Sequence, residues 1–369
     1  MNGIADNFSE FGDAFGYVRI LSPADIPPID GRFLDVAVLD MHHNWSNLGH
    51  DSLVRAIGEI ALDLHPLLRQ AGLVIRAFSY DVRRSLMVPE ASDGRHLLFI
   101  GTGGPGYIDP HRNDGVSEWT QGIREDPSWE EPLFRLFESI LKNEQAAFLA
   151  ICHSFGVLCR WTGVARPEVR GPGKGGKSSG IMINTLTAEA EQHPWFRRFA
   201  AELPDWKHHS VLDSRLFDLI PARDGFPKDI TPLAYECDPE SGGRGEAITM
   251  LEFARHKGGV MPRILGVNHH PEIRDRKRQR RLLDLKFQRG EVTADWYEER
   301  TRTLGQAFES RESEQRILLT SQYTLLAPLR FHLYRLVRMR ALAMRCETEL
   351  HENQVIHLPS GILDREETF

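Results

Sequence analysis

Short apolar runs rich in β-branched residues alternate with segments of helical periodicity along the first half of the chain. Residues 33–41, FLDVAVLDM, are typical of a strand buried on both faces, and the apolar positions of 52–72 recur at helical spacing. The same patterns predict three more strands and one more helix, at 73–81, 95–103 and 146–152 and at 132–144. This alternation predicts an α/β fold with a doubly wound, mainly parallel sheet and helices on both faces.

The second half of the chain is less regular before it becomes helical. A helix is predicted over 153–164, followed by a long loop rich in proline and glycine. Shorter β-like runs lie at 180–186, 230–237, 247–253 and 263–270, and charged, amphipathic helices at 276–304 and 312–346. We therefore expect three parts: an irregular N-terminal arm (1–32), an α/β domain (33–273) and a helical C-terminal extension (274–369).

Composition places the chain among soluble globular proteins. Its 369 residues are 41% hydrophobic and 26% charged, which is enough apolar material for a large core. The N-terminus has acidic residues where an export signal would have basic ones, and its apolar runs are too short to cross a bilayer. The four cysteines lack CxxC spacing, so we expect no disulfide framework, no metal site and no cofactor. A cytoplasmic protein is the expectation.

Charge is unevenly distributed. Residues 274–346 contain 17 lysines and arginines against nine acidic residues, whereas the whole chain has a net charge of -7. A basic appendage could bind an acidic partner or nucleic acid, but arginine-rich helices also form ordinary salt-bridged faces, and we favour that interpretation. The apolar stripe in 325–345 suggests packing against the core, dimerisation or docking to another protein, with membrane-surface binding as a weaker alternative.

Cys152 is the strongest candidate for chemistry. It follows an apolar strand and precedes a helix, and a nucleophile on such a turn is exposed at the carboxyl edge of the sheet. The positive end of the helix dipole favours the thiolate, and the first N–H groups of the helix can bind an oxyanion. The alternative for an isolated cysteine is a buried structural residue.

Three motifs favour a reactive cysteine over a structural one at position 152. AAFLAICHSFG around Cys152 resembles the nucleophile elbow of the class I glutamine amidotransferase family, LFIGTGGPGYIDP (98–110) its oxyanion loop, and LGVNHHPEI (265–273) its terminal His-Pro-Glu element. The motifs occur in the family's order, and the resemblance covers about 33–273. It implies a flavodoxin-like sheet of the class I amidotransferase type.

The resemblance also implies roles for individual residues. Cys152 would be the nucleophile, His270 the base and Glu272 the group that orients the imidazole. The backbone N–H groups of Gly104 and His153 would form the oxyanion hole. The expected substrate contacts are Gly103, Ser154, Gly156 and Ser214. His269, next to the catalytic histidine, is expected to be a packed neighbour.

The elbow departs from the family pattern at three positions. The family has glycine on both sides of the cysteine and a substrate-holding glutamine four residues after it, where this chain has Ala150, Ser154 and Gly156. Alanine and serine are small enough for a tight turn, although a positive φ is harder for them than for glycine. Gly156 removes a substrate contact, so the triad is better supported than glutamine as the substrate.

Residues 171–178, GPGKGGKS, match the formula of a phosphate-binding P-loop. A P-loop joins a buried strand to a helix, whereas the residues before this segment make a poor strand and those after it look like a strand rather than a helix. We therefore favour an active-site loop. The histidine pairs at 42–43 and 208–209 lack further ligands at metal-site spacing, and a substrate contact is considered for the first pair.

The function that this resemblance implies is hydrolysis of glutamine to glutamate and ammonia through a thioester, with ammonia used by a separate synthetase partner. One alternative keeps the triad and changes the substrate, as in a γ-glutamyl or other amide hydrolase or an acyl transferase of specialised biosynthesis. Another is a non-catalytic scaffold with the same fold. No nucleic-acid or membrane partner is expected.

Overall fold

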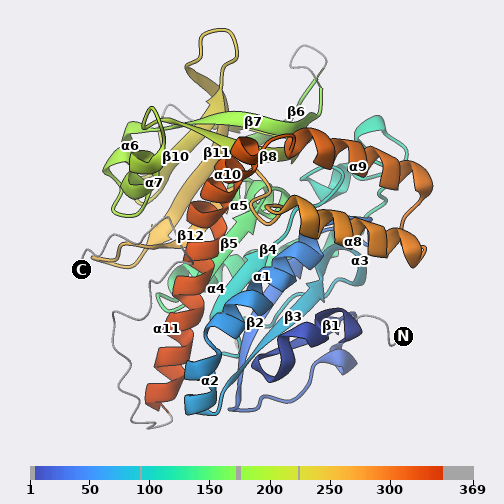
Figure 1. Cartoon of the computed structure of the whole chain (residues 1–369), viewed down its shortest axis with the longest axis vertical. Helices are drawn as coiled ribbons and strands as arrows, with labels where there is room; N and C mark the ends of the chain where they lie inside the picture. The colour runs from blue at the N-terminus through green and yellow to red at the C-terminus, as the bar shows by residue number, and fades with distance from the viewer. Residues whose placement is uncertain (1–4, 92–93, 172–175, 223–224, 344–369) are drawn as a thin grey trace.

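The computed structural model describes residues 5–91, 94–171, 176–222 and 225–343. A ten-stranded sheet runs through the molecule in the order β1-β3-β2-β4-β5-β12-β11-β10-β7-β8 (Figure 1). Its first six strands are parallel: β1 (Phe15–Ile20), β3 (Val74–Asp81), β2 (Phe33–Asp40), β4 (Leu98–Gly101), β5 (Ala147–Ile151) and β12 (Pro262–Val267). Without β1 this half has the 2-1-3-4-5 order of a flavodoxin-like sheet.

The other half of the sheet is antiparallel. It consists of β11 (Arg244–Arg255), β10 (Thr231–Cys237), β7 (Ser178–Leu186) and β8 (His208–Arg215). A separate two-stranded sheet pairs β6 (Ala165–Val169) with β9 (Phe217–Pro221). The predicted α/β fold with a mainly parallel sheet is confirmed, and the antiparallel strands extend it beyond β12.

Two apolar cores lie on the two faces of the sheet. Along β5 the side chains alternate, with Leu149 in one core and Phe148 in the other, as expected for a strand buried on both sides. Helices α1 (Gly49–Asp63), α2 (His65–Ala71) and α11 (Ala327–Ala343) cover the first face, and α4 (Glu130–Lys142) and α5 (His153–Thr162) the second (Figure 1). The remaining short helices are α3 (Val82–Ser85), α6 (Ala188–Gln192), α7 (Phe196–Glu202), and the 3₁₀ segments Ala5–Ala14, Pro23–Asp25, Pro110–Arg112, Glu118–Thr120 and Pro127–Trp129.

The N-terminal arm is more ordered than expected. Residues Phe15–Ile20 form β1, which pairs in parallel with β3 at the edge of the sheet, so the expectation of an irregular arm is wrong there. An edge strand is paired on one side only, and the four middle residues of β1 are only partly buried. A short run with glycine and arginine therefore suffices, and its apolar signal is weak.

The C-terminal helices are part of the core. They are α8 (Arg276–Gln288), α9 (Ala294–Ala307), α10 (Arg311–Ser321), the π-helix Gln322–Leu326 and α11. The apolar stripe of α11 packs into the core of its own chain through residues such as Leu329 and Leu333. Packing against the core, one of the uses expected for this stripe, is thus observed.

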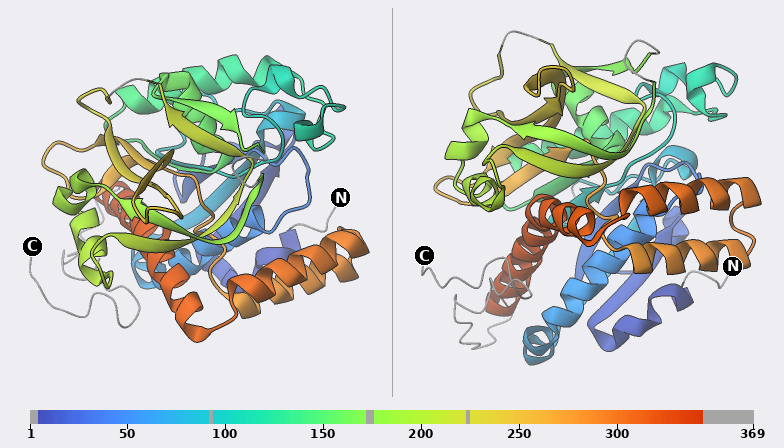
Figure 2. Two further views of the ribbon diagram at one scale, coloured as in Figure 1. Left: turned by 90° about the horizontal axis from the view of Figure 1, so that it is seen from above. Right: turned by 45° about the horizontal axis from the view of Figure 1, so that its top comes forward.

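Basic residues of this region pair with acids on α1. Lys286 lies 2.8 Å from Asp51, Arg278 contacts Glu59, and Arg330 contacts Asp63. Helices α8 and α9 lie side by side over one end of α1 (Figure 2). These contacts agree with the interpretation of the basic residues as a salt-bridged face. No helix in the described part of the chain is both long and apolar enough to span a bilayer.

Gly266 on β12 provides a test of the packing beneath the cysteine turn. A Cβ at this position would lie 2.1 Å from Cδ2 of Phe155, a fully buried ring on α5. We expect Gly266→Ala to lower the free energy of unfolding by about 1–3 kcal/mol, measured by urea denaturation. The matched control is Gly305→Ala on α9, where a Cβ meets no atom within 4 Å and should be neutral or stabilising by up to about 1 kcal/mol. Equal stability of the two variants would contradict this packing.

Candidate active site

Cys152 occupies a sharp turn between β5 and α5. Its backbone has φ 49° and ψ -102°, a conformation that residues other than glycine rarely adopt. Its N–H donates to the carbonyl of Val267 at 2.7 Å, and its carbonyl accepts from the N–H of Gly156 at 2.9 Å. Bonds to two elements thus hold the strained turn that the sequence predicted.

Ser154 stabilises this turn from below. Its hydroxyl bonds to both the N–H and the carbonyl of Ile151, at 2.9 and 3.0 Å. Gly101 on β4 leaves room for it, because a Cβ there would lie 2.5 Å from the serine side chain. Ser154 is buried and is not among the residues that line the cavity, so the structure places it away from the position expected for a substrate contact. The local hydrogen bond explains why serine is present.

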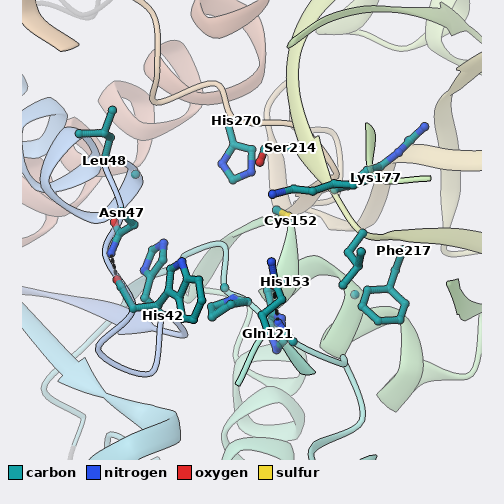
Figure 3. Close-up of a pocket in the computed structure, with 18 of the residues that line it drawn as sticks. His42, Asn47, Leu48, Gln121, Cys152, His153, Lys177, Ser214, Phe217 and His270 are labelled. Atoms are coloured by element: carbon teal, nitrogen blue, oxygen red, sulfur yellow. Dashed lines mark hydrogen bonds between the residues drawn. The ribbon is translucent and has the colours of Figure 1, made fainter. Parts of the chain in front are cut away.

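His270 faces Cys152 from the end of β12. Its Nδ1 lies 2.9 Å from Oε1 of Glu272. The ring lies beside Cys152 at the same edge of the sheet (Figure 3). Burial alone would lower the pKa of His270. The negative charges of Glu272 and of the Cys152 thiolate outweigh that effect and raise the pKa well above its usual value. These charges therefore favour the imidazolium form of His270.

Glu272 is buried against the start of α1. Only 3% of it is exposed, and a Cβ on Gly49 would lie 2.7 Å from its Oε1. The helix dipole at this end of α1 favours a negative charge. His42, at the end of β2, lies on the same side, and its Nδ1 is 2.8 Å from Asp40. Glycine at position 49 thus allows the carboxylate to reach both the helix and His270.

The glycine-rich loop after β4 closes against the cysteine. A Cβ on Gly103 would lie 2.9 Å from Cε1 of His270 and 3.6 Å from Cβ of Cys152, and one on Gly104 would lie 2.3 Å from the carbonyl of Met41. Both positions therefore require glycine. Within the described part of the chain, the N–H groups of Gly104 and His153 have no hydrogen-bond acceptor, so both remain available to an oxyanion.

Arg83 fixes the position of this loop. The fully buried guanidinium donates to the carbonyls of Met41 and Pro105, each at 2.8 Å, and pairs with buried Glu125. A buried ion pair with these extra hydrogen bonds holds a defined geometry. It ties the loop to the end of β2 without placing a charge in the cavity.

These elements surround a cavity of about 210 Å³ that opens above Cys152. Of the residues expected at the site, its lining includes Cys152, His270, Gly104, His153, Gly156 and Ser214. Gly103 lies just behind, between the cysteine and the histidine. Such a volume suits a small metabolite better than a polymer.

Position 156 is filled from another segment. A Cβ on Gly156 would lie 2.8 Å from Cδ1 of Ile108, which lies in the chain after the glycine-rich loop. The larger glutamine side chain of the family pattern would collide with this isoleucine. The departure noted at Gly156 is thus coupled to Ile108, a relation that the sequence alone could not indicate.

The remaining histidines lie where packing dominates. His269 is buried, and its Nε2 bonds to the hydroxyl of Thr324 in the π-helix at 3.1 Å, as expected for a packed neighbour. His209 is likewise buried, and burial lowers its pKa to about 3. His208 pairs with Asp205 at 2.6 Å outside the cavity. His42 lines the cavity, and the substrate contact considered for it stays a prediction.

The glycine-rich segment 171–178 does not have P-loop architecture. It follows β6, a strand of the small separate sheet, and leads into β7 rather than a helix. Residues 172–175 lie outside the described part of the chain. Lys177 lines the cavity, which agrees with the interpretation of an active-site loop.

Several cavity residues were not identified from the sequence. Gln121 lies in a connection after β4, and its Oε1 accepts from the N–H of Gly106 at 3.0 Å. Trp296 and Arg300 come from α9. The excess of basic residues in 274–346 is visible in the sequence, but no local pattern marks which of them reach the cavity.

One cluster could in principle attract a metal ion. Asp109, His111 and Glu130 bring their ligand atoms within 4.8 Å of one another. Arg160 contacts both carboxylates and supplies the positive charge that they need. His111 is exposed and the group lies outside the cavity, so nothing further points to a metal at this cluster.

No protein-family model and no curated protein matches this sequence. Solved structures with a related shape include SMU.1228c, at 14% identity and a TM-score of 0.42, covering 81% of this chain and 98% of that one. A glutamine amido transferase from Methylobacillus flagellatus gives 12% and 0.45, covering 84% and 95%. A candidate GMP synthase subunit from Thermoplasma acidophilum gives 14% and 0.35, covering 64% and 85%. Likeness at this level assigns neither family nor activity.

The raised pKa of His270 can be measured by NMR titration of its ring signals. We expect the wild-type ring to titrate above the usual value of about 6.5. Cys152→Ala and Glu272→Gln should each lower this pKa, because each removes a negative charge that stabilises the imidazolium. His209→Gln, which alters a buried histidine outside the cavity, is the control. An unchanged pKa in both site variants would contradict the charge coupling.

Proposed function

We propose that this chain is a cysteine-dependent amidase of the class I glutamine amidotransferase type. In its first form the proposal takes glutamine as substrate and glutamate and ammonia as products. The observation that carries it is that Cys152 and His270 line one small cavity, while buried Glu272 lies 2.9 Å from Nδ1 of the histidine and, with Cys152, raises its pKa. A structural cysteine would need neither the strained backbone nor this partner.

The first half of the reaction forms a thioester. The Sγ of Cys152 attacks the amide carbon, and the N–H groups of Gly104 and His153 stabilise the oxyanion. His270, which holds the proton taken from the thiol, gives it to the departing nitrogen. The C–N bond breaks, and ammonia leaves.

The second half restores the thiol. Water attacks the thioester carbon while His270 accepts its proton, and the C–S bond then breaks to release the carboxylic acid. Glu272 keeps Nδ1 protonated, so that the other ring nitrogen faces the sulfur. This tautomer allows the same imidazole to act as acid and as base.

Ammonia is costly to lose to solvent, so a separate synthetase that uses it is the partner we propose for the glutamine form of the reaction. A reactive thiolate also suits the reducing cytoplasm. The proposal of a synthetase partner does not require that the C-terminal helices bind it.

A second candidate changes only the substrate. Ile108 occupies the space into which a substrate-holding side chain at position 156 would extend. The substrate end of the cavity therefore differs from the family pattern, while the cysteine end agrees with it. This favours another small amide or γ-glutamyl substrate as the alternative to glutamine, hydrolysed by the same steps or transferred to another acceptor.

The direct test measures covalent modification and turnover together. Wild-type protein should be labelled at Cys152 by the glutamine-mimicking diazoketone 6-diazo-5-oxo-norleucine, as located by mass spectrometry, and should release glutamate from glutamine. Cys152→Ala should lose activity by at least about 10⁴-fold. Cys237→Ala, which removes another free thiol, should retain it.

Labelling by a general electrophile such as iodoacetamide, without labelling by the diazoketone or glutamate release, would favour the second candidate. No labelling of Cys152 by either reagent would contradict the amidase proposal and favour a scaffold role.

Gly49 tests the positioning of Glu272. In Gly49→Ala the new Cβ would lie 2.7 Å from Oε1 and displace the carboxylate. On whichever amide proves to be the substrate, kcat should fall by about 10–100-fold with little change in KM, because orientation rather than binding is lost. The pKa of His270 should fall in the same variant, which a general loss of stability would not produce. Full activity with an unshifted pKa would refute this positioning role.

A further inference from the structure

Two positively charged side chains meet at the mouth of the cavity from segments outside the parallel sheet. Lys177 directly precedes β7, and Arg300 lies on α9. Lys177 extends toward Cys152 (Figure 3), and both residues line the cavity. Neither residue is needed for the triad or for the oxyanion hole. Their presence in the cavity therefore needs a separate explanation.

The backbone on both sides of Lys177 is held firmly. The hydroxyl of Ser178 donates to Asp213 at 2.6 Å, and Nε of Arg170 donates to the carbonyl of Gly176 at 3.1 Å. Asp213 and Arg170 belong to a buried network of charged residues under the loop. Lys177 is thus directed into the cavity by a fixed frame.

Arg300 is supported by an aromatic ring. Its guanidinium carbon lies 5.5 Å from the ring centroid of Trp296, one turn earlier on α9. Its Nε is buried and has no hydrogen-bond acceptor among the described residues. The guanidinium therefore keeps an N–H donor that none of the described residues satisfies.

The two cations have little internal compensation. Burial, and then the charge of Arg300, lower the pKa of Lys177. Glu299 is the acid that opposes both, and it forms an ion pair with neither in the described part of the chain. By contrast Arg215, which also lines the cavity, pairs with Glu236 at 2.7 Å. Partly buried cations without partners are unfavourable unless a ligand supplies the negative charge.

We propose that Lys177 and Arg300 form a carboxylate-binding subsite, so that the amidase substrate is a small amide that also carries a carboxylate. This inference rests on the proposed function, since it assigns a second group of the same substrate. The subsite holds the carboxylate by charge-assisted hydrogen bonds, and the amide carbon then reaches the sulfur of Cys152. Helix α9 thereby selects the substrate.

Paired alkylating reagents test this subsite without knowledge of the natural substrate. Iodoacetate and iodoacetamide both alkylate a thiolate through their CH₂ carbon and release iodide. They differ chiefly in the group on that carbon, which is a carboxylate in the first and a neutral amide in the second. The ratio of their second-order rate constants at Cys152, divided by the same ratio for glutathione, measures carboxylate preference. Thiolate reactivity affects both reagents and largely cancels.

We expect this normalised ratio to be about tenfold or more in the wild type. Lys177→Gln and Arg300→Gln should each reduce it several-fold, and the double variant should approach unity. Lys207→Gln is the control, since this exposed lysine precedes β8 at the end away from the cavity. Glutarate should protect Cys152 from iodoacetamide in the wild type but not in the double variant.

The outcomes separate this inference from the proposed function. A normalised ratio near unity in the wild type, with rapid alkylation of Cys152, would overturn the subsite and leave the amidase proposal intact. The two substitutions could instead slow alkylation by both reagents and leave the normalised ratio unchanged. Lys177 would then only stabilise the thiolate, and the carboxylate subsite would again be overturned. Failure of both reagents to modify Cys152 would instead contradict the reactive cysteine.

Discussion

The parallel pairing of β5 with β12 is the constraint on which the candidate site depends. Val267 lies in register with Ile151, and its carbonyl accepts the N–H of Cys152 at 2.7 Å. Two neighbouring parallel strands end at the same edge of the sheet, so residues 118 positions apart in the chain meet there. The strained turn at Cys152 persists because this pairing and the first turn of α5 hold it from both sides.

The C-terminal helices support this pairing from behind. The hydroxyl of Ser321 donates to the carbonyl of Pro271, and Thr324 bonds to His269, so the π-helix contacts the segment that carries His270 and Glu272. Single-turn π-helices often occur where a helix must adjust to a functional segment. Helix α9 then contributes Trp296 and Arg300 to the cavity. These helices therefore connect the core with both ends of the candidate site.

Different contacts determine the residues at the two ends of the cavity. At the cysteine end, glycine at 49, 103 and 104 and serine at 154 are required by contacts of the surrounding backbone and side chains. At the substrate end, Ile108 replaces a reaching side chain, and Lys177 and Arg300 introduce charge. The contacts at the first end fix the position of Cys152, whereas the residues at the second end come from segments outside the parallel strands. This is why the reaction type is easier to propose than the substrate.

Local sequence determined the elements whose signal is strong: FLDVAVLDM became β2, AAFLAIC became β5 and the turn at Cys152, and the order of the glycine-rich and histidine motifs placed their residues at one sheet edge. Only the tertiary structure decided that β1 joins the sheet, that Ser154 bonds to its own turn, and that Ile108 fills the space at Gly156. The same holds for Lys177 and Arg300, which are 123 positions apart. Hydrophobic periodicity reports which face of an element is buried, but contacts between distant segments leave no trace in it. The turn that carries Cys152 could therefore be predicted along the chain, while the lining of the cavity comes from segments that meet only after folding.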